Sequence, residues 1–178
     1  PFPDDVGSVA RLVELLGLEG FGANGTLFFT AWLTDVLRAA GAQSGIRSAG
    51  FNGVMYSLLE DPYIGRNSDM RGLSVDSLIG FAAVCGCGLD MVPVPGDTFD
   101  EEIASMIVDV AALSVALAKP LGARILPIPG KRASEFTDFS HDFFHNCRVM
   151  PARNQGLTTA CLKGAPVDFL EPRIRPIK

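Results

Sequence analysis

Two segments of this chain repeat almost the same pattern, and this repeat strongly limits the folds available to it. Residues 89–98 and residues 123–131 each contain an apolar run that ends in Pro-x-Pro-Gly followed by a charged residue. The first prolines of the two motifs, Pro93 and Pro127, are 34 positions apart. One segment with helical character lies between them, so the pattern predicts a strand–helix–strand unit.

The fold class that we expect is therefore α/β, built from parallel strand–helix–strand units. The strands are expected over residues 88–94 and 123–128, with a right-handed connection. Both strands then end at the same edge of the sheet, where ligands usually bind. Asp97 and Lys131 follow the two glycine turns, and we expect them to face one shared cleft at this edge.

The helix that joins the two strands is expected over about residues 98–118. Asp100, Glu101 and Glu102 stand in its first turn, where the helix dipole favours negative charge. Its other side chains are apolar on nearly every side, which predicts a buried helix that other polypeptide covers. Asp109 interrupts this apolar surface, and we expect it to face solvent or a basic residue.

The first half of the chain is expected to be mainly helical. After a first helix near the N-terminus, we expect a second helix over residues 26–40. Residues 54–59 are expected to form a strand, and Ser74 is expected to cap a third helix. The first helix is capped by Asp4 or Asp5, and the residues expected on its buried stripe are Val6, Val9, Leu12, Val13 and Leu16.

Composition and charge exclude some classes of function. The net charge is −5, and the chain lacks the clustered basic residues of a nucleic-acid-binding domain. No apolar run is long enough to predict a membrane span, and the start lacks the pattern of a signal peptide. Apolar residues make up 48% of the chain, which starts with Pro1, so we expect a missing N-terminal part or another protein subunit to pack against it. We expect a cytoplasmic or organellar soluble compartment.

Several segments together resemble a known family. The resemblance covers about residues 5–150, and the paired Pro-x-Pro-Gly motifs are its most specific part. The family is the uncharacterised "domain of unknown function 711", whose bacterial members are often labelled PFL family protein. The matching segments are residues 21–26, 33–35, 60–61, 84–98 and 124–131.

This resemblance carries implications for the fold. The family is similar in fold to the glycyl-radical enzymes, whose core is a barrel of two parallel half-sheets, and its members are much longer than this chain. Residues 1–150 would then be the C-terminal portion of an α/β barrel-like domain that is incomplete here, and residues 151–178 an extended proline-rich tail. Residues 148–151 lack the glycine of the radical loop, so we expect no glycyl-radical chemistry.

The two glycine turns are the first candidate site. Backbone N–H groups at Gly96 and Gly130, and the helix N-terminus at Thr98, suit a carboxylate or phosphate group. Asp97 would bind a cation or hydroxyl group, and Lys131 an anionic group. In the alternative, Asp97 or Thr98 only caps the helix and Lys131 pairs with Asp97.

The cysteines provide a second candidate. Cys85, Cys87, Cys147 and Cys161 form no C-x-x-C pair, which favours a reducing compartment. Cys85 lies at a bend between a helix and a strand and is a candidate nucleophile; by the resemblance it is placed like a thiyl-radical cysteine. Thiolate formation needs a cation or a helix N-terminus, whereas this bend follows a helix C-terminus. The alternative is a small buried residue in a tight turn.

Two further sequence patterns each have a functional interpretation and a structural alternative. His141 and His145, with Cys147 nearby, would hold zinc if they shared a helix face, and the alternative is an ordinary packed aromatic segment. Residues 20–25 spell G-x-G-x-x-G, but a predicted helix precedes them instead of a strand. We expect a helix–helix connector there.

Two functions follow from these observations. The first is an α/β protein that binds or processes a small anionic metabolite, with Cys85, Asp97 and Lys131 as candidate catalytic residues. The alternative is a non-catalytic structural or regulatory subunit of a larger assembly. The sequence identifies no cofactor.

Overall fold

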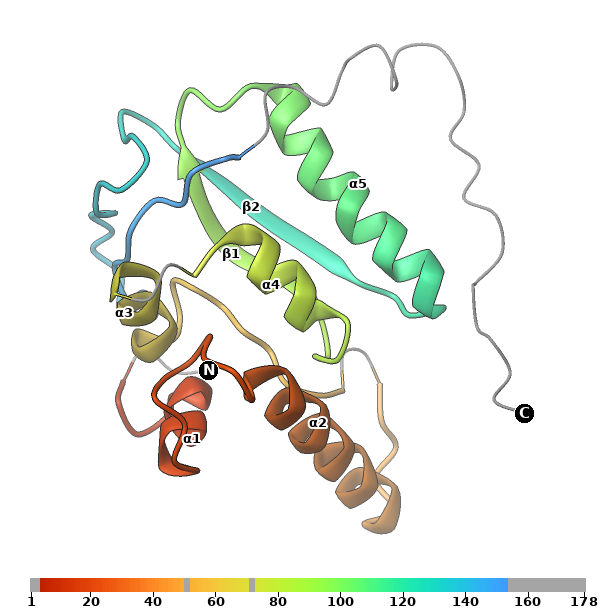
Figure 1. The fold of residues 1–178 in the computed structure, drawn as a ribbon. Helices are drawn as coiled ribbons and strands as arrows, with labels where there is room; N and C mark the ends of the chain where they lie inside the picture. The colour runs from red at the N-terminus through yellow and green to blue at the C-terminus, as the bar shows by residue number, and fades with distance from the viewer. Residues whose placement is uncertain (1–3, 50–51, 71–72, 154–178) are drawn as a thin grey trace.

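The computed structural model describes residues 4–49, 52–70 and 73–153 (Figure 1). In chain order the elements are α1 (Val9–Leu15), α2 (Thr26–Gln43), α3 (Pro62–Met70), α4 (Val75–Ala82), β1 (Gly88–Pro95), α5 (Asp100–Leu117) and β2 (Gly122–Ile128). The protein is thus mixed α/β. None of the described helices is long and apolar enough to cross a membrane. Most of the expected tail, from residue 154 onward, lies outside the described residues.

The predicted pairing of the two Pro-x-Pro-Gly strands is confirmed. β1 and β2 are neighbours in a two-stranded sheet, and they run parallel. The pairing begins with Gly88 beside Gly122 and ends with Pro95 beside Ile128. α5 joins the two strands, so both glycine turns open at the same end of the sheet, as expected.

A β-bulge interrupts the pairing near the amino end of β1. Leu89 pairs with Ala123 and Val92 with Ile125, so two residues of β1 lie opposite the single residue Arg124. One of these two, Met91, has a φ of 49°, in the left-handed region that residues with a Cβ rarely adopt. The bulge shifts the register, and the motif prolines of the two strands therefore do not face each other.

The helices α4 and α5 lie on one face of this sheet (Figure 1). α4 packs on β1, α5 packs on β2, and the two helices contact each other. Ser74 caps α4 by accepting a hydrogen bond from the Ser77 N–H at 3.2 Å, as the sequence predicts. All of β1 except Pro95 is buried, whereas much of β2 is exposed.

The strand expected over residues 54–59 is reduced to one bridge. Ser57 forms an isolated parallel bridge with Asp90, and the Leu58 N–H donates to the Asp90 carbonyl at 3.4 Å. The segment therefore lies along β1 without joining the sheet as a regular strand. Pro62, shortly after this segment, starts α3, because proline suits the first position of a helix.

One buried carboxylate organises the N-terminal half. Asp61 Oδ1 accepts hydrogen bonds from the backbone N–H groups of Tyr63 at 3.0 Å and Ile64 at 3.2 Å, at the start of α3. The same oxygen accepts from Ser8 Oγ at 2.7 Å. Asp61 Oδ2 accepts from the first two N–H groups of α1, at 2.9 and 3.2 Å. Asp61 thus caps two helices that are distant in sequence.

The first helix differs from its prediction. Ser8 caps α1 by accepting from the Arg11 N–H at 3.0 Å, so neither Asp4 nor Asp5 is the cap. Of the expected stripe only Val13 is buried, because α1 is short and much of its surface has no described neighbour. The glycine-rich segment 20–25 joins α1 to α2, which makes it a helix–helix connector as expected.

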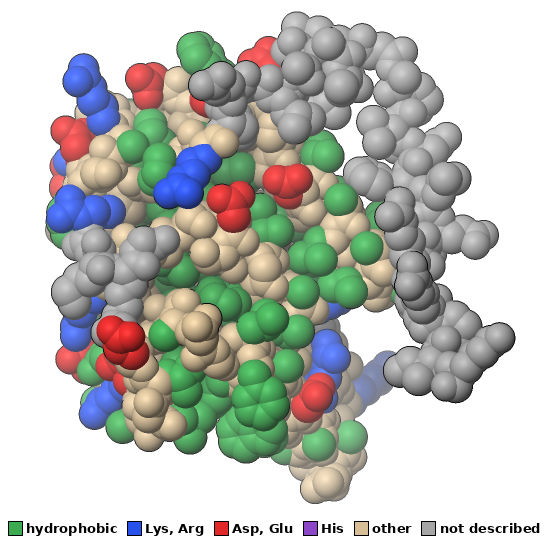
Figure 2. All heavy atoms as spheres, viewed as in Figure 1, with side chains coloured by type: hydrophobic (Ala, Val, Ile, Leu, Met, Phe, Trp, Pro, Cys, Tyr) green, Lys and Arg blue, Asp and Glu red, His purple; other side chains and the backbone are tan. Residues whose placement is uncertain are grey.

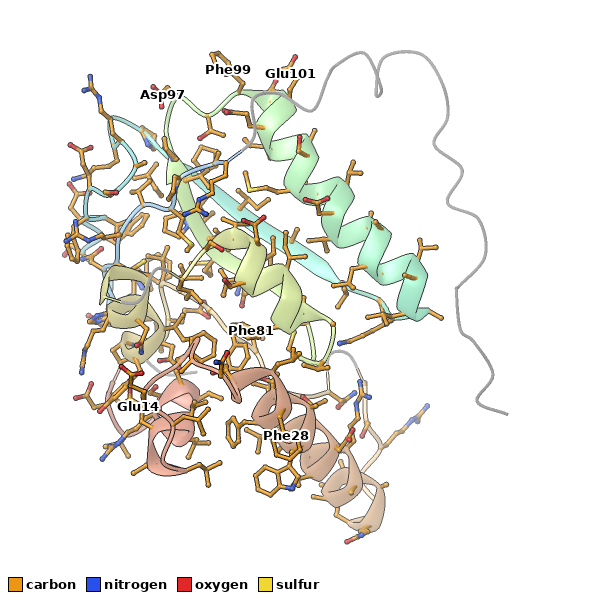
Figure 3. All side chains as sticks on the ribbon, in the orientation of Figure 1. Glu14, Phe28, Phe81, Asp97, Phe99 and Glu101 are labelled. Carbon is orange, nitrogen blue, oxygen red and sulfur yellow. The ribbon has the colours of Figure 1, made fainter. Side chains whose placement is uncertain are left out.

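α2 exposes an apolar stripe to solvent. Figure 2 shows hydrophobic side chains gathered in the lower part of the view, and Figure 3 shows Phe28 on this part of the molecule. We call this surface the α2 outer face, and it consists of Leu27, Phe28, Trp32, Val36 and Leu37.

The described residues cover only one side of α5, and the expected cover of its outer side by other polypeptide stays a prediction. Met106 and Val110 are buried, but Ile107 and Leu117 are 48% and 41% exposed. The helix is therefore covered where it meets α4 and the sheet, and its outer side is open. Asp109 is exposed, as predicted.

Candidate functional site

The two predicted glycine turns meet at the carboxyl edge of the sheet. The Gly96 N–H donates to the Lys131 carbonyl at 3.1 Å, which fixes the turns side by side. Asp97, however, is exposed and points away from the sheet (Figure 3). Lys131 Nζ lies 2.9 Å from Asp138 Oδ2, so the alternative in which Lys131 pairs with Asp97 is wrong. A ligand role for Gly96 and Gly130 stays a prediction.

The start of α5 also differs from the alternative drawn from the sequence. Phe99 is the N-cap residue, and its N–H donates to the Glu102 carboxylate at 2.9 Å. The Thr98 hydroxyl donates instead to the Pro95 carbonyl at 2.7 Å and closes the turn. Neither Asp97 nor Thr98 therefore caps the helix.

The bend that carries Cys85 has a cation beside it. Lys119, just after α5, donates to the Ala82 carbonyl at 2.9 Å and also to the Cys85 carbonyl. Its charge offsets the negative end of the α4 dipole. The residues near this bend in sequence do not predict a cation beside it, because Lys119 lies 34 residues later in the chain. The Cys85 and Cys87 side chains are both buried.

The two thiols of this bend have different proton affinities. The pKa of Cys85 is lowered, mainly because the Cys87 thiol donates a hydrogen bond to its sulfur, with smaller contributions from backbone N–H groups and the Lys119 charge. The pKa of Cys87 is raised, because it is the donor in this bond and because it is buried. The Gly88 N–H lies 3.3 Å from the Cys85 sulfur. The arrangement favours a thiolate at Cys85 but shields it from solvent.

A pocket of about 500 Å³ lies next to this bend. Gly86 and Lys119 form one wall, and the C-terminal part of α2, including Arg38, forms another. The Arg38 Nε donates to the Asn52 carbonyl at 3.3 Å. Asn52 also lines the pocket, and the other lining residues are small or apolar: Leu37, Gly41, Ala42, Ile46, Ser48 and Pro120. We call this the Arg38–Lys119 pocket.

A second charged site lies within the sheet itself. Asp90 of β1 is buried, and its Oδ1 accepts a hydrogen bond from the Arg124 Nε of β2. Glu60 Oε2 lies 3.7 Å from an Arg124 nitrogen. The Asp90–Arg124 pair was not among the sites expected from the sequence. The repeat itself indicates this pair, because Asp90 and Arg124 carry opposite charges at equivalent positions of the two repeated segments, 34 residues apart.

The zinc reading of the last described segment is not supported. Residues 141–147 form no helix, so His141 and His145 share no helix face. Cys147 is buried, and burial raises the pKa of its thiol to about 12, which opposes the thiolate that zinc needs. The described residues contain no cluster of three metal-binding side chains.

The chain is similar to proteins of one family, which is described as uncharacterised. The family model described as "Uncharacterised ACR (DUF711)" matches residues 1–145. The chain belongs to this family. The sequence resemblance based on the paired motifs is therefore confirmed at the level of the DUF711 family.

Relatives of the DUF711 chain occur in bacteria and archaea. It is 40% identical over 139 residues to a UPF0210 protein of Desulforudis audaxviator, covering 78% of this chain and 31% of the relative. A UPF0210 protein of Pyrobaculum arsenaticum is 38% identical over 138 residues, with the same shares covered. One from Lactobacillus delbrueckii is 32% identical over 167 residues, 94% of this chain and 37% of the relative. The chain thus spans about a third of the length of these relatives.

Proposed function

We propose that this part of the DUF711 fold binds a small anionic metabolite in the Arg38–Lys119 pocket. The observation that carries the proposal is the charge of the pocket. Two cationic side chains line it, and no carboxylate is among the described residues of its wall. Its volume of about 500 Å³ lies within the range of about 300–1,000 Å³ typical of small-molecule sites.

The two cations differ in what they offer a ligand. The Arg38 guanidinium has five N–H donors, and its bond to the Asn52 carbonyl uses one of them. Lys119 directs its ammonium at the carbonyls that end α4, so it contributes mainly its charge. We therefore assign direct anion binding to Arg38 and electrostatic support to Lys119.

The electrostatics of Lys119 favour an anionic ligand. The pKa of Lys119 is lowered, chiefly by burial; the charge of Cys85 opposes this shift and the charge of Arg38 adds to it. The two cations therefore repel each other across the pocket. An anion bound between them would relieve this repulsion and raise the pKa of Lys119. The apolar lining suits a ligand that carries an aliphatic part beside its anionic group.

A processing reaction would use the neighbouring bend. Cys85 is the candidate nucleophile, because its thiolate is favoured and Gly86 next to it lines the pocket. Its sulfur is buried, so the bend must open before it can react. The turns at Gly96, Thr98 and Gly130, with Asp97 and Lys131, remain a further proposed ligand site at the opposite end of the strands.

We further propose that other polypeptide completes this fold, as in a barrel like that of the glycyl-radical enzymes, with this chain as the C-terminal portion. The exposed β2 strand, the open side of α5 and the α2 outer face support this proposal. Parallel strands are normally buried on both faces. The same surfaces favour the second candidate function, a structural or regulatory subunit of a larger soluble assembly.

The test is a titration of the chain with inorganic phosphate and, separately, with pentanoate. Side-chain ¹⁵N resonances of Arg38 and Lys119 should shift with saturation, and the pKa of Lys119 should rise. Arg38→Gln should weaken binding by about 10-fold to 100-fold, the effect of a charged hydrogen bond. Arg132→Gln, an exposed site at the other end of the sheet, should bind as the wild type does. Equal binding by Arg38→Gln and wild type would refute the proposal.

A further inference from the structure

The ammonium group of Lys119 is fully occupied by backbone carbonyls. It donates to the Ala82 carbonyl at 2.9 Å, to the Ala83 carbonyl at 3.3 Å, and to the Cys85 carbonyl. An ammonium group has three N–H donors, so these three bonds use all of them. Lys119 therefore ties the end of α4, and the bend after it, to the segment between α5 and β2.

The backbone of Lys119 is anchored independently of this contact. The Lys119 N–H donates to the Ser114 carbonyl at 3.0 Å, and the Ser114 hydroxyl donates to the Lys119 carbonyl at 2.6 Å. The ends of α4 and α5 lie at the same end of the sheet, where Gly88 pairs with Gly122 (Figure 1). The contact with the α4 carbonyls can therefore open by a turn of the Lys119 side chain alone.

The two halves of the bend are held in different ways. Residues 86–87 are fixed by main-chain bonds, because the Gly86 N–H donates to the Val54 carbonyl and the Gly122 N–H to the Cys87 carbonyl, both at 2.7 Å. Residues 82–85, at the end of α4, have the Lys119 side chain as the donor to three of their carbonyls. We therefore expect the bend to open at residues 82–85 when Lys119 turns away.

Access to the Cys85 sulfur limits what this thiol can do. Only 1% of Cys85 is exposed, and a buried group reacts through the fraction of molecules that are transiently open. The pKa of Cys85 is lowered chiefly by the hydrogen bond from Cys87, and the charge of Lys119 contributes least. Movement of Lys119 therefore changes the exposure of Cys85 more than it changes the formation of the thiolate.

An anion in the neighbouring pocket competes for the same ammonium group. Lys119 lines the Arg38–Lys119 pocket, whose volume of about 500 Å³ leaves room for its side chain to turn toward a ligand. A hydrogen bond from an ammonium group to an anion adds the attraction between two full charges, which a neutral carbonyl lacks. The α4 carbonyls are therefore the weaker partners once an anion is bound to Arg38.

We propose that Lys119 keeps Cys85 shielded until an anion binds in the Arg38–Lys119 pocket. Arg38 binds the anion, the Lys119 side chain turns from the α4 carbonyls to join it, and residues 82–85 open to expose the Cys85 sulfur. This inference rests on the anion site proposed above and adds its regulation. Lys119 is then a positioning residue that makes the candidate nucleophile accessible only in the presence of an anionic ligand.

The test measures the rate at which iodoacetamide alkylates Cys85 in the whole chain, identified by tandem mass spectrometry, with and without inorganic phosphate. Saturating phosphate should raise this rate about 10-fold, the effect of losing roughly one hydrogen bond to a charged group. Sodium chloride at equal ionic strength and pH should not raise it. Cys147 is the internal control, because it is also 1% exposed but does not line the pocket, and its rate should not change.

Two variants separate the contributions of the cations. Lys119→Met removes the ammonium group, so Cys85 should react about 100-fold faster than in the wild type without phosphate, and phosphate should have no further effect. Arg38→Gln should require about 10-fold to 100-fold more phosphate for the same acceleration. If Lys119→Met accelerates Cys147 equally, the variant is unfolded, and the response of the wild type to phosphate decides.

The outcomes distinguish this inference from the anion site on which it rests. Phosphate that shifts the side-chain ¹⁵N resonance of Arg38 but leaves the alkylation rate of Cys85 unchanged, or lowers it, would overturn the shielding role of Lys119 and leave the anion site standing. Absence of any phosphate-dependent shift would refute both. Faster alkylation of Cys85 at the phosphate concentrations that saturate the Arg38 shift is the result expected.

Discussion

Replacing Asp61 by asparagine tests how far one side chain stabilises the N-terminal half. Asparagine keeps one acceptor oxygen, but an NH₂ group takes the place of the other. Whichever way the amide turns, it faces the N–H groups of one helix with a donor, and that helix loses the hydrogen bonds that Asp61 accepts from it. Loss of an N-cap costs about 0.5–2 kcal/mol, and each buried donor left unpaired about 1–3 kcal/mol.

The expected loss for Asp61→Asn is therefore about 2–4 kcal/mol. Asp61→Ala removes both acceptors and should cost more, about 3–5 kcal/mol. Urea unfolding followed by far-UV circular dichroism measures both. With an m-value of about 2 kcal/mol/M, a loss of 3 kcal/mol lowers the unfolding midpoint by about 1.5 M.

The matched control is Asp142→Asn, because Asp142 is an exposed aspartate. It should change the free energy of unfolding by less than about 0.5 kcal/mol. Ser8→Ala, which removes both a hydroxyl donor to Asp61 and the N-cap of α1, should fall between the two, at about 1–2 kcal/mol. If Asp61→Asn is as stable as the wild type to within about 0.5 kcal/mol, the double cap does not stabilise the fold as argued.

Two further predictions follow from backbone and burial. Burial raises the pKa of Tyr56, and its hydrogen bond with Thr30 partly opposes this shift. Ionisation of Tyr56 therefore favours the unfolded chain, so the free energy of unfolding should fall above about pH 10, where an unfolded tyrosine ionises. Absorbance at 295 nm should show a late step that Tyr56→Phe removes, and an early ionisation of Tyr56 in the folded chain would contradict this. Gly88→Ala should separate the strands, because its φ is 111° and a Cβ there meets the Gly122 carbonyl; thermal unfolding should detect the loss. Gly80→Ala, with open space at its Cβ, should instead be neutral or slightly stabilising.

The sequence was most informative where a local pattern decides the structure. The repeated Pro-x-Pro-Gly motif, with a helical segment between its copies, predicted the parallel pairing of β1 and β2. Ser74 ahead of an apolar stripe predicted the start of α4. The cap lies next to its helix, and a single helix joins the two motif copies, so neither effect depends on the rest of the fold.

Features set by long-range contacts were not predictable in the same way. Lys119 reaches the Cys85 bend only because α5 returns the chain to the start of β1. Asp61 accepts from the start of α1 across more than fifty residues, so no local pattern points to this contact. The apolar surface of α5 predicts that other polypeptide covers the helix, but it does not show whether the described residues or a partner supply that cover.

The bulge at Met91 sets the phase of the whole strand. Residues 88–89 pair with partners 34 positions later, whereas residues 92–95 pair with partners 33 positions later. Side chains alternate between the faces of a strand, so removal of one residue here would turn either half of β1 over. The buried Val92 and Val94 would then exchange faces with their neighbours, or Asp90 would turn away from Arg124. The extra residue lets a charged half and an apolar half occupy one continuous strand, and single-residue deletions in β1 should be far less tolerated than substitutions.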